Sequence, residues 1–272
     1  MSQTATPEPK PWQPFTPRGV ARFTRASTNR LIIVQLISAL IVAACVVWFL
    51  AVCYSPVILG AFQKLPDDAK ISQQQLQGLQ PGALAENRFL SIGVESVDNP
   101  FAGIGDLQIR MGSTELKLCS LIGCVEIPYP AGWTISLARK SVEPRWGAWE
   151  PMLLAGTGLF TMLKLVVSWG VLGLIYMWVP KLIAFYADRE LNGFDSWKLA
   201  CAAQLPGAFF AAGAILLYGS GALDLIRFLI LYALHIPVGW IYLVIAPFLL
   251  PKLPGILPKL SGKKVKKNPF KK

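Results

Sequence analysis

The sequence predicts an α-helical integral membrane protein with four transmembrane helices and a small β-rich extracytoplasmic domain between the first and the second. Three observations support this prediction. Apolar residues make up 54% of the 272 residues and charged residues only 15%, against the roughly 25% of charged residues in soluble domains. The mean hydropathy is +0.49. Finally, the chain contains four of the mostly apolar stretches of about 20 residues that a spanning helix requires.

The four apolar stretches occupy residues 31–59, 152–179, 199–218 and 225–250. Pro151 immediately precedes the second stretch, and because proline is favoured in the first turn of a helix, we expect that helix to begin there. Only a few residues join the third and fourth stretches, which predicts a tight antiparallel pair. Residues 152–250 are therefore expected to form a three-helix transmembrane bundle.

The first stretch, residues 31–59, is expected to be an uncleaved signal anchor. It is about twice as long as the 7–15 apolar residues of a secretory signal peptide. Leu50-Ala51-Val52-Cys53 resembles the lipidation box of bacterial lipoproteins. That box has a small residue before its cysteine, and Val52 is not small, so lipidation at Cys53 is the less favoured alternative.

The flanking charges predict the orientation. The N-terminal tail, residues 1–30, has five basic residues and one acidic residue, and the Lys-rich tail, residues 251–272, has eight lysines and no acidic residue. Cytoplasmic flanks of spans carry an excess of Lys and Arg, and four spans place both tails on one side. We therefore expect both termini in the cytoplasm, residues 60–151 outside, and a location in the bacterial inner (plasma) membrane.

Both tails are also expected to contact anionic lipids. Three arginines recur at a helical spacing, consistent with a basic helix lying in the headgroup layer: Arg18, Arg22 and Arg25. The lysines after the last span would each add about 1 kcal/mol of attraction to an anionic surface, foremost Lys263, Lys264, Lys266 and Lys267. Nucleic-acid binding is the competing interpretation, but it favours several stacking aromatic residues, so we expect no nucleic-acid partner.

The outer segment, residues 60–151, contains strand signals. Leu107, Ile109 and Met111 alternate with polar residues, and Leu116 and Leu118 do so after Gly112-Ser113. Alternation of apolar and polar residues indicates strands with one buried face, and two such runs around a short turn predict a hairpin.

Cys119 and Cys124 lie next to this hairpin. In an oxidising compartment they could close a small disulfide loop, and two buried free thiols are the alternative. A zinc site would need a second Cys or His pair, which the outer segment lacks, so we expect no metal. Trp146 and Trp149 stand just before the second span, where tryptophan rings anchor helices at the membrane interface; a substrate-binding role is the alternative.

Two ionisable side chains fall within the predicted spans. Such residues are functional candidates by default, and Lys164 and His235 could share an intramembrane cavity. Lys164 could instead lie about a turn below the outer surface and extend its amine to the headgroups. His235 precedes Pro237, and a histidine can satisfy the carbonyl group that a proline frees. No carboxylate for proton coupling is expected at depth, which disfavours a proton-driven carrier.

Small residues line one face of the third span. Ala203, Gly207 and Ala211 recur every four residues, and such residues let helices approach closely. The partner helix could belong to this chain or to a second copy.

No enzyme signature occurs in the sequence. Phosphate-binding glycine loops, His-Glu-x-x-His and Gly-x-Ser-x-Gly are all absent, and a single histidine inside a span offers no evident acid–base centre. We expect no catalytic residue and no cofactor.

The order of elements resembles that of a group of bacterial integral membrane proteins related to the Yip-type family. The shared features are a basic N-terminal stretch, one span, and a bundle with small residues at Ala203, Gly207 and Ala211. The resemblance implies a scaffold or membrane-organising protein without catalysis. We therefore expect a non-enzymatic protein whose outer domain binds a partner or another copy of the chain. The alternative is a small transporter or lipid-handling protein with a cavity near Lys164 and His235.

Overall fold

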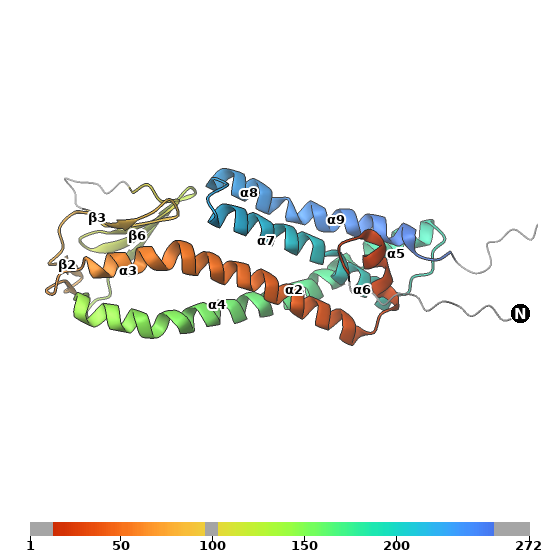
Figure 1. Ribbon diagram of the computed structural model, residues 1–272, viewed down its shortest axis with the longest axis horizontal. Coiled ribbons are helices and arrows are strands. Elements are labelled where there is room, and N and C mark those ends of the chain that lie inside the picture. Colours follow the sequence, from red (N-terminus) through yellow and green to blue (C-terminus); the bar gives the residue numbers. More distant parts are fainter. Residues whose placement is uncertain (1–12, 96–102, 253–272) are drawn as a thin grey trace, which may run out of the picture. The chain divides into compact units, whose positions relative to one another are not determined.

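The computed structural model describes residues 13–95 and 103–252. Among these residues, four helical stretches are long and apolar enough to cross a membrane (Figure 1): Thr28–Gln63, Arg139–Tyr176, Gly193–Gly219 and Leu225–Leu249. A small β-sheet region separates the first from the second along the chain. The prediction of four apolar helices with a β-rich insertion is confirmed at this level. The four lysines of the C-terminal tail that were predicted to contact lipid lie outside the described residues.

The chain divides into two compact units. The terminal unit comprises Met1–Gln35, Ser168–Gly207 and Ile236–Lys272, and the sheet unit comprises Leu36–Val167 and Ala208–His235. Every candidate span contributes to both units, because each unit boundary falls within one of these helical stretches.

The terminal unit contains several helices around a core of small residues. Its described elements are α1 (Pro17–Arg22), the 3-10 turn η1 (Phe23–Arg25), the starts of α2 (Thr28–Phe49) and α7 (Leu205–Gly219), the end of α4 (Arg139–Tyr176), α5 (Trp178–Tyr186), α6 (Gly193–Ala203), α9 (His235–Ile245) and η3 (Ala246–Leu249). Side-chain caps begin two of them: the Thr16 hydroxyl accepts from the Gly19 amide at 3.0 Å, and the Asn192 side chain accepts from the Asp195 amide at 2.7 Å. Such caps satisfy amides that a helix leaves unpaired.

Small residues allow α4 and α6 to lie close together. The Trp197 indole donates to the Gly170 carbonyl at 3.2 Å, and the Cys201 sulfur occupies the space that a side chain at Gly173 would take. Ala203, Gly207 and Ala211 are all buried. This small-residue face is therefore covered by the chain itself.

The sheet unit contains a five-stranded sheet in the order β3-β4-β5-β6-β7. The strands are β3 (Gly82–Glu86), β4 (Leu90–Val94), β5 (Leu107–Met111), β6 (Glu115–Ser120) and β7 (Gly123–Pro128). The β4–β5 pair is parallel and the others are antiparallel. The predicted hairpin is the β5–β6 pair, in which Ile109 lies opposite Leu118.

A second, three-stranded sheet has the order β2-β1-β8. It consists of β2 (Gln75–Gln77), β1 (Lys70–Ser72) and β8 (Ile135–Ser136).

Tyr129 closes the β5–β6 hairpin of the larger sheet by donating to the Gly112 carbonyl at 3.0 Å. Burial, with a smaller contribution from Glu115, raises the pKa of the Tyr129 phenol to about 12. The phenol is therefore neutral at physiological pH and can donate this hydrogen bond.

The first long helix is longer than a membrane is thick, and its last part packs on the sheet. After α2 it continues through a π-helical segment (Leu50–Tyr54) into α3 (Ser55–Gln63). Its 36 residues correspond to about 54 Å of helix, against a hydrocarbon core of about 30 Å. Val57 and Ala61 of α3 are buried against the apolar sheet face formed by Leu84, Leu90, Ile92 and Val94. The last residues of the predicted span 31–59 therefore support the sheet.

The helix of the second candidate span does not begin at Pro151. It starts at Arg139 and runs through Pro144 and Pro151, so the end of the predicted β-rich segment is helical. Side chains near the two prolines contact α3. The Ser55 hydroxyl donates to the Glu150 carboxylate, and the Trp146 ring packs edge-on against Phe62 with ring centroids 5.7 Å apart. Trp149, the other predicted anchor, is exposed.

Candidate functional site

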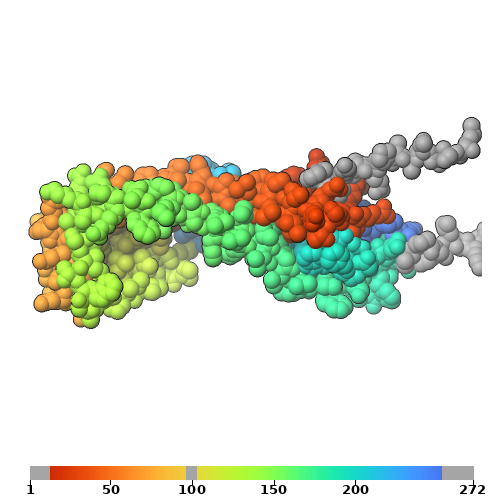
Figure 2. Space-filling view, turned by 90° about the horizontal axis from the view of Figure 1, so that it is seen from below, coloured from red at the N-terminus to blue at the C-terminus, as the bar shows by residue number. Residues whose placement is uncertain are grey.

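The sheet unit contains an apolar cavity of about 680 Å³, within the 300–1,000 Å³ typical of ligand pockets. The first long helix lines it with Val46, Phe49, Leu50 and Tyr54. The end of α7 and the start of α8 (Leu225–Ala233) contribute Ile215, Tyr218, Leu225, Phe228, Leu229 and Tyr232. The sheet supplies Asp106, Leu107, Ser120, Leu121 and Ile122. The cavity therefore lies between helices and sheet. Figure 2 shows that the surface of the sheet unit is also hollowed beside α4, whose residues do not line this cavity.

Helix contacts place this cavity at the level of the turn that joins the third and fourth candidate spans. An added Cβ at Gly219, the last residue of α7, would be 2.7 Å from the Trp48 ring and 2.9 Å from the Phe49 ring. Gly158 of α4 lies similarly against Val47. The short connection from α7 to α8 follows Gly219 directly. Residues 47–49 of the first long helix and residue 158 of α4 therefore lie beside this connection on the neighbouring helices.

Aromatic rings form one wall of the cavity. The centroid of the Tyr218 ring lies 5.0 Å from Phe89, 5.4 Å from Phe49 and 4.5 Å from Phe228. Offset and edge-to-face aromatic pairs add about 0.5–1.5 kcal/mol beyond the area they bury. This wall is therefore preformed.

Polar groups of the β3–β4 turn connect the sheet to the helix ends. Arg88 donates to the Gly221 carbonyl at 2.8 Å and to the Leu223 carbonyl at 2.5 Å. The Asn87 amide donates to the Cys53 carbonyl at 2.7 Å within the π-helical segment. Because Pro56 has no N–H, the hydrogen-bond ladder of the helix is interrupted just before it. The π-helical segment itself lines the cavity with Leu50 and Tyr54.

The cavity has one charged corner. The Tyr218 hydroxyl donates to the Asp106 carboxylate at 2.6 Å, and Asp106 is the one charged side chain among the lining residues named above. Because a carboxylate can accept several hydrogen bonds, the pair provides a polar attachment point in the cavity.

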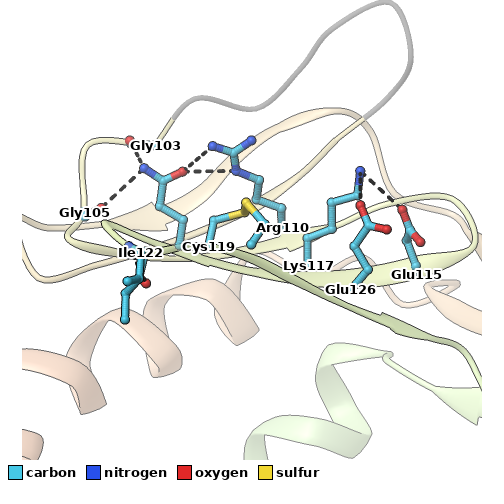
Figure 3. Close-up of a disulfide and its surroundings, with 11 residues drawn as sticks. Gly103, Gly105, Arg110, Glu115, Lys117, Cys119, Ile122 and Glu126 are labelled. Carbon is cyan, nitrogen blue, oxygen red and sulfur yellow. Dashed lines mark hydrogen bonds and ion pairs between the residues drawn. A yellow bond between two sulfur atoms is a disulfide. The ribbon is translucent and has the colours of Figure 1, made fainter.

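The β6–β7 turn forms an apolar rim. Its two central residues, Leu121 and Ile122, are 63% and 98% exposed, although such turns usually consist of Asn and Gly. Figure 3 shows Ile122 projecting from the sheet on the side opposite Arg110 and Lys117. Directly behind the turn, Cys119 and Cys124 face each other across the ladder and are joined by a disulfide. The bridge holds the apolar rim in a fixed turn.

The disulfide can be tested by peptide mapping of the unreduced protein. Cleavage after Leu121 is expected to leave the peptides that contain Cys119 and Cys124 joined, and reductant should separate them. Cys45, Cys53 and Cys201 are free thiols and serve as the internal control for alkylation under denaturing conditions. Alkylation of Cys119 or Cys124 without reductant would contradict the bridge.

Lys164 and His235 do not line this cavity. Lys164 is exposed on α4, six residues beyond Gly158 and so about 9 Å along the helix. The His235 ring lies 4.9 Å from the Tyr232 ring, and only Tyr232 belongs to the lining. The possible intramembrane site at Lys164 and His235 therefore stays a prediction, separate from this cavity. The sequence did not single out Asp106 and Tyr218, because the two residues are far apart along the chain. The sequence signal that could have indicated this cavity is the pair Leu121 and Ile122, because apolar residues are unusual in a turn between strands.

The remaining predicted residues lie elsewhere. Arg18, Arg22 and Arg25 are exposed in the terminal unit. Within residues 13–95 and 103–252, no three His, Cys, Asp or Glu side chains are grouped so that they could hold a metal ion.

Comparison of the chain with protein-family models, curated proteins and solved structures finds no match. The resemblance to the Yip-type proteins remains one of element order.

Proposed function

We propose that this chain is a non-enzymatic polytopic membrane protein whose extracytoplasmic domain binds the hydrocarbon chain of a lipid. The observation that carries the proposal is the composition of the 680 Å³ cavity, which is lined jointly by three candidate spans and by the sheet. The basic tails support a cytoplasmic location of both termini in a bacterial inner membrane.

The position of the cavity favours a membrane lipid over a soluble ligand. Val46, Ile215 and Tyr232 line it on the span side of the level marked by Gly219. Leu107, Leu121 and Ile122 line it from the sheet. A hydrocarbon chain could therefore pass from the bilayer into the outer domain without crossing water.

The chemistry of the lining favours a hydrocarbon chain over a polar solute. A hydrocarbon chain can enter an apolar lining without leaving a polar group unpaired, whereas a polar solute would need hydrogen-bond partners throughout. Asp106 and Tyr218 together offer one polar position at the edge of the cavity, suited to the polar end of a lipid.

Photolabelling tests the proposal. The full chain, reconstituted with a lipid that carries a photoreactive group in its acyl chain, is expected to be labelled within Leu225–Ala233. Leu229→Trp, which fills the cavity, should reduce this labelling about tenfold, because fitting the acyl chain beside the larger ring would cost about 1–3 kcal/mol.

Two variants serve as controls. Leu163 is an exposed leucine of α4 in the same unit, so Leu163→Trp should leave the labelling unchanged. Lys164→Leu should also be neutral, whereas a binding site at Lys164 and His235 would lose labelling. Equal labelling of the wild type and Leu229→Trp would overturn the proposal.

A scaffold that binds a protein partner is the second candidate. β7 is an edge strand and all its residues are exposed, including Val125 and Ile127. Edge strands readily pair with strands of other chains. A pure scaffold would show no labelling of the cavity in the same experiment.

A further inference from the structure

The three arginines of the N-terminal stretch line a polar cavity in the terminal unit. This cavity has a volume of about 410 Å³. Arg18, Arg22 and Arg25, with Ala21 and Thr24 between them, form one side, and Leu249, Leu250 and Pro251 form the other. None of these lining residues is acidic.

The arginines project from a segment that is docked and fixed. Val20 and Phe23 on its opposite face are 0% exposed. The buried Lys198 amine donates to the Thr24 carbonyl at 2.6 Å and to the Ala26 carbonyl at 3.1 Å, and it pairs with the Asp195 carboxylate at 2.6 Å. A preorganised site loses less conformational entropy on binding.

The opposite wall of the cavity is also held in place. The Arg189 guanidinium donates to the Leu250 carbonyl at 2.5 Å, and the Glu190 amide donates to the Pro251 carbonyl at 3.2 Å. Leu250 directly follows the last candidate span, which ends at Leu249. The cavity therefore lies at the end of a candidate span, where lipid headgroups would lie if Leu225–Leu249 crosses the membrane.

We propose that this cavity is a phosphate-binding site that an anionic lipid headgroup occupies. A guanidinium group can donate two parallel hydrogen bonds to phosphate oxygens. Arg25 also borders a second cavity, which Glu190 and Asp195 line. Because these two carboxylates would repel a phosphate group, we expect the phosphate to lie closer to Arg18 and Arg22 than to Arg25. The exposed Leu249 side chain would contact the glycerol and acyl region. This site is independent of the proposed hydrocarbon cavity in the sheet unit.

Native mass spectrometry of the full chain tests the proposal. Phosphatidylglycerol and phosphatidylcholine are titrated separately against the protein in a neutral detergent. Arg18→Gln/Arg22→Gln should weaken the binding of phosphatidylglycerol at least tenfold and leave that of phosphatidylcholine unchanged. Arg18→Lys/Arg22→Lys keeps the charge but lacks the planar pair of donors, so its affinity should be intermediate.

Lys181→Gln is the matched control, because Lys181 is an exposed cation of the same unit; binding should stay at the wild-type level. All variants should unfold at the same temperature, since the replaced side chains are exposed. Inorganic phosphate alone is titrated as a further arm. Arginine-dependent binding of phosphate with none of the lipid would reassign the occupant to a soluble phosphate. Equal losses in Lys181→Gln and Arg18→Gln/Arg22→Gln, or no loss in either, would overturn the site.

Discussion

Lys198→Met is expected to lower the free energy of unfolding by about 3 kcal/mol, because removing one partner of a buried ion pair leaves the other groups without compensation. The amine is buried, with Lys198 only 6% exposed, and it donates to the Thr24 and Ala26 carbonyls while pairing with Asp195. Methionine fills similar volume but donates nothing. The loss should be measured by chemical unfolding in detergent.

The same substitution should release the arginine-bearing segment. Trypsin is expected to cleave after Arg22 and Arg25 at least tenfold faster in Lys198→Met, since the two carbonyl contacts no longer hold the backbone. Lys181→Met, at an exposed position of the same unit, should change neither stability nor cleavage. Asp195→Asn combined with Lys198→Met should recover part of the lost stability, because no unpaired charge then remains. Unaltered protease resistance in Lys198→Met would show that Lys198 does not fix the segment.

Features that depend on local composition could be predicted from the sequence. The four apolar stretches needed only length and the absence of charge, and the β5–β6 hairpin needed only the alternation around Leu107 to Leu118. The residues that make up each of these signals are close together in the sequence, so neither prediction required knowledge of the tertiary structure.

Features that depend on distant contacts could not be predicted. Pro144 and Pro151 disfavour a helix interior, yet α4 runs through both, and its Trp146 and Glu150 contact Phe62 and Ser55 of α3. Likewise, no local pattern relates Tyr218 to Asp106, which is 112 residues away. The polar residues that the sequence did single out, Lys164 and His235, are conspicuous by composition, whereas the cavity is defined by packing.

Gly105→Ala is expected to destabilise the sheet unit by about 2–3 kcal/mol, the upper part of the usual cost of forcing extra atoms into a packed core. An added Cβ would lie 2.6 Å from both the Leu90 carbonyl carbon and the Ser91 nitrogen. These are backbone atoms of β4, so no side-chain rotation can relieve the clash. The Gly105 amide also donates to the buried Ser91 hydroxyl at 2.7 Å, a bond that the displaced strand would weaken.

The consequence should extend to the cavity, because Gly105 immediately precedes Asp106 and Leu107. Displacing this segment moves the Asp106 carboxylate away from the Tyr218 hydroxyl, so the labelling of Leu225–Ala233 should fall together with the stability. Gly147→Ala is the matched control, since a Cβ there meets nothing within 4 Å and Gly147 lies within α4. In a helix interior alanine is favoured over glycine by about 0.5–1 kcal/mol, so this variant should be slightly more stable than the wild type. Equal effects of the two substitutions would show that the β4–β5 pairing does not require glycine at position 105.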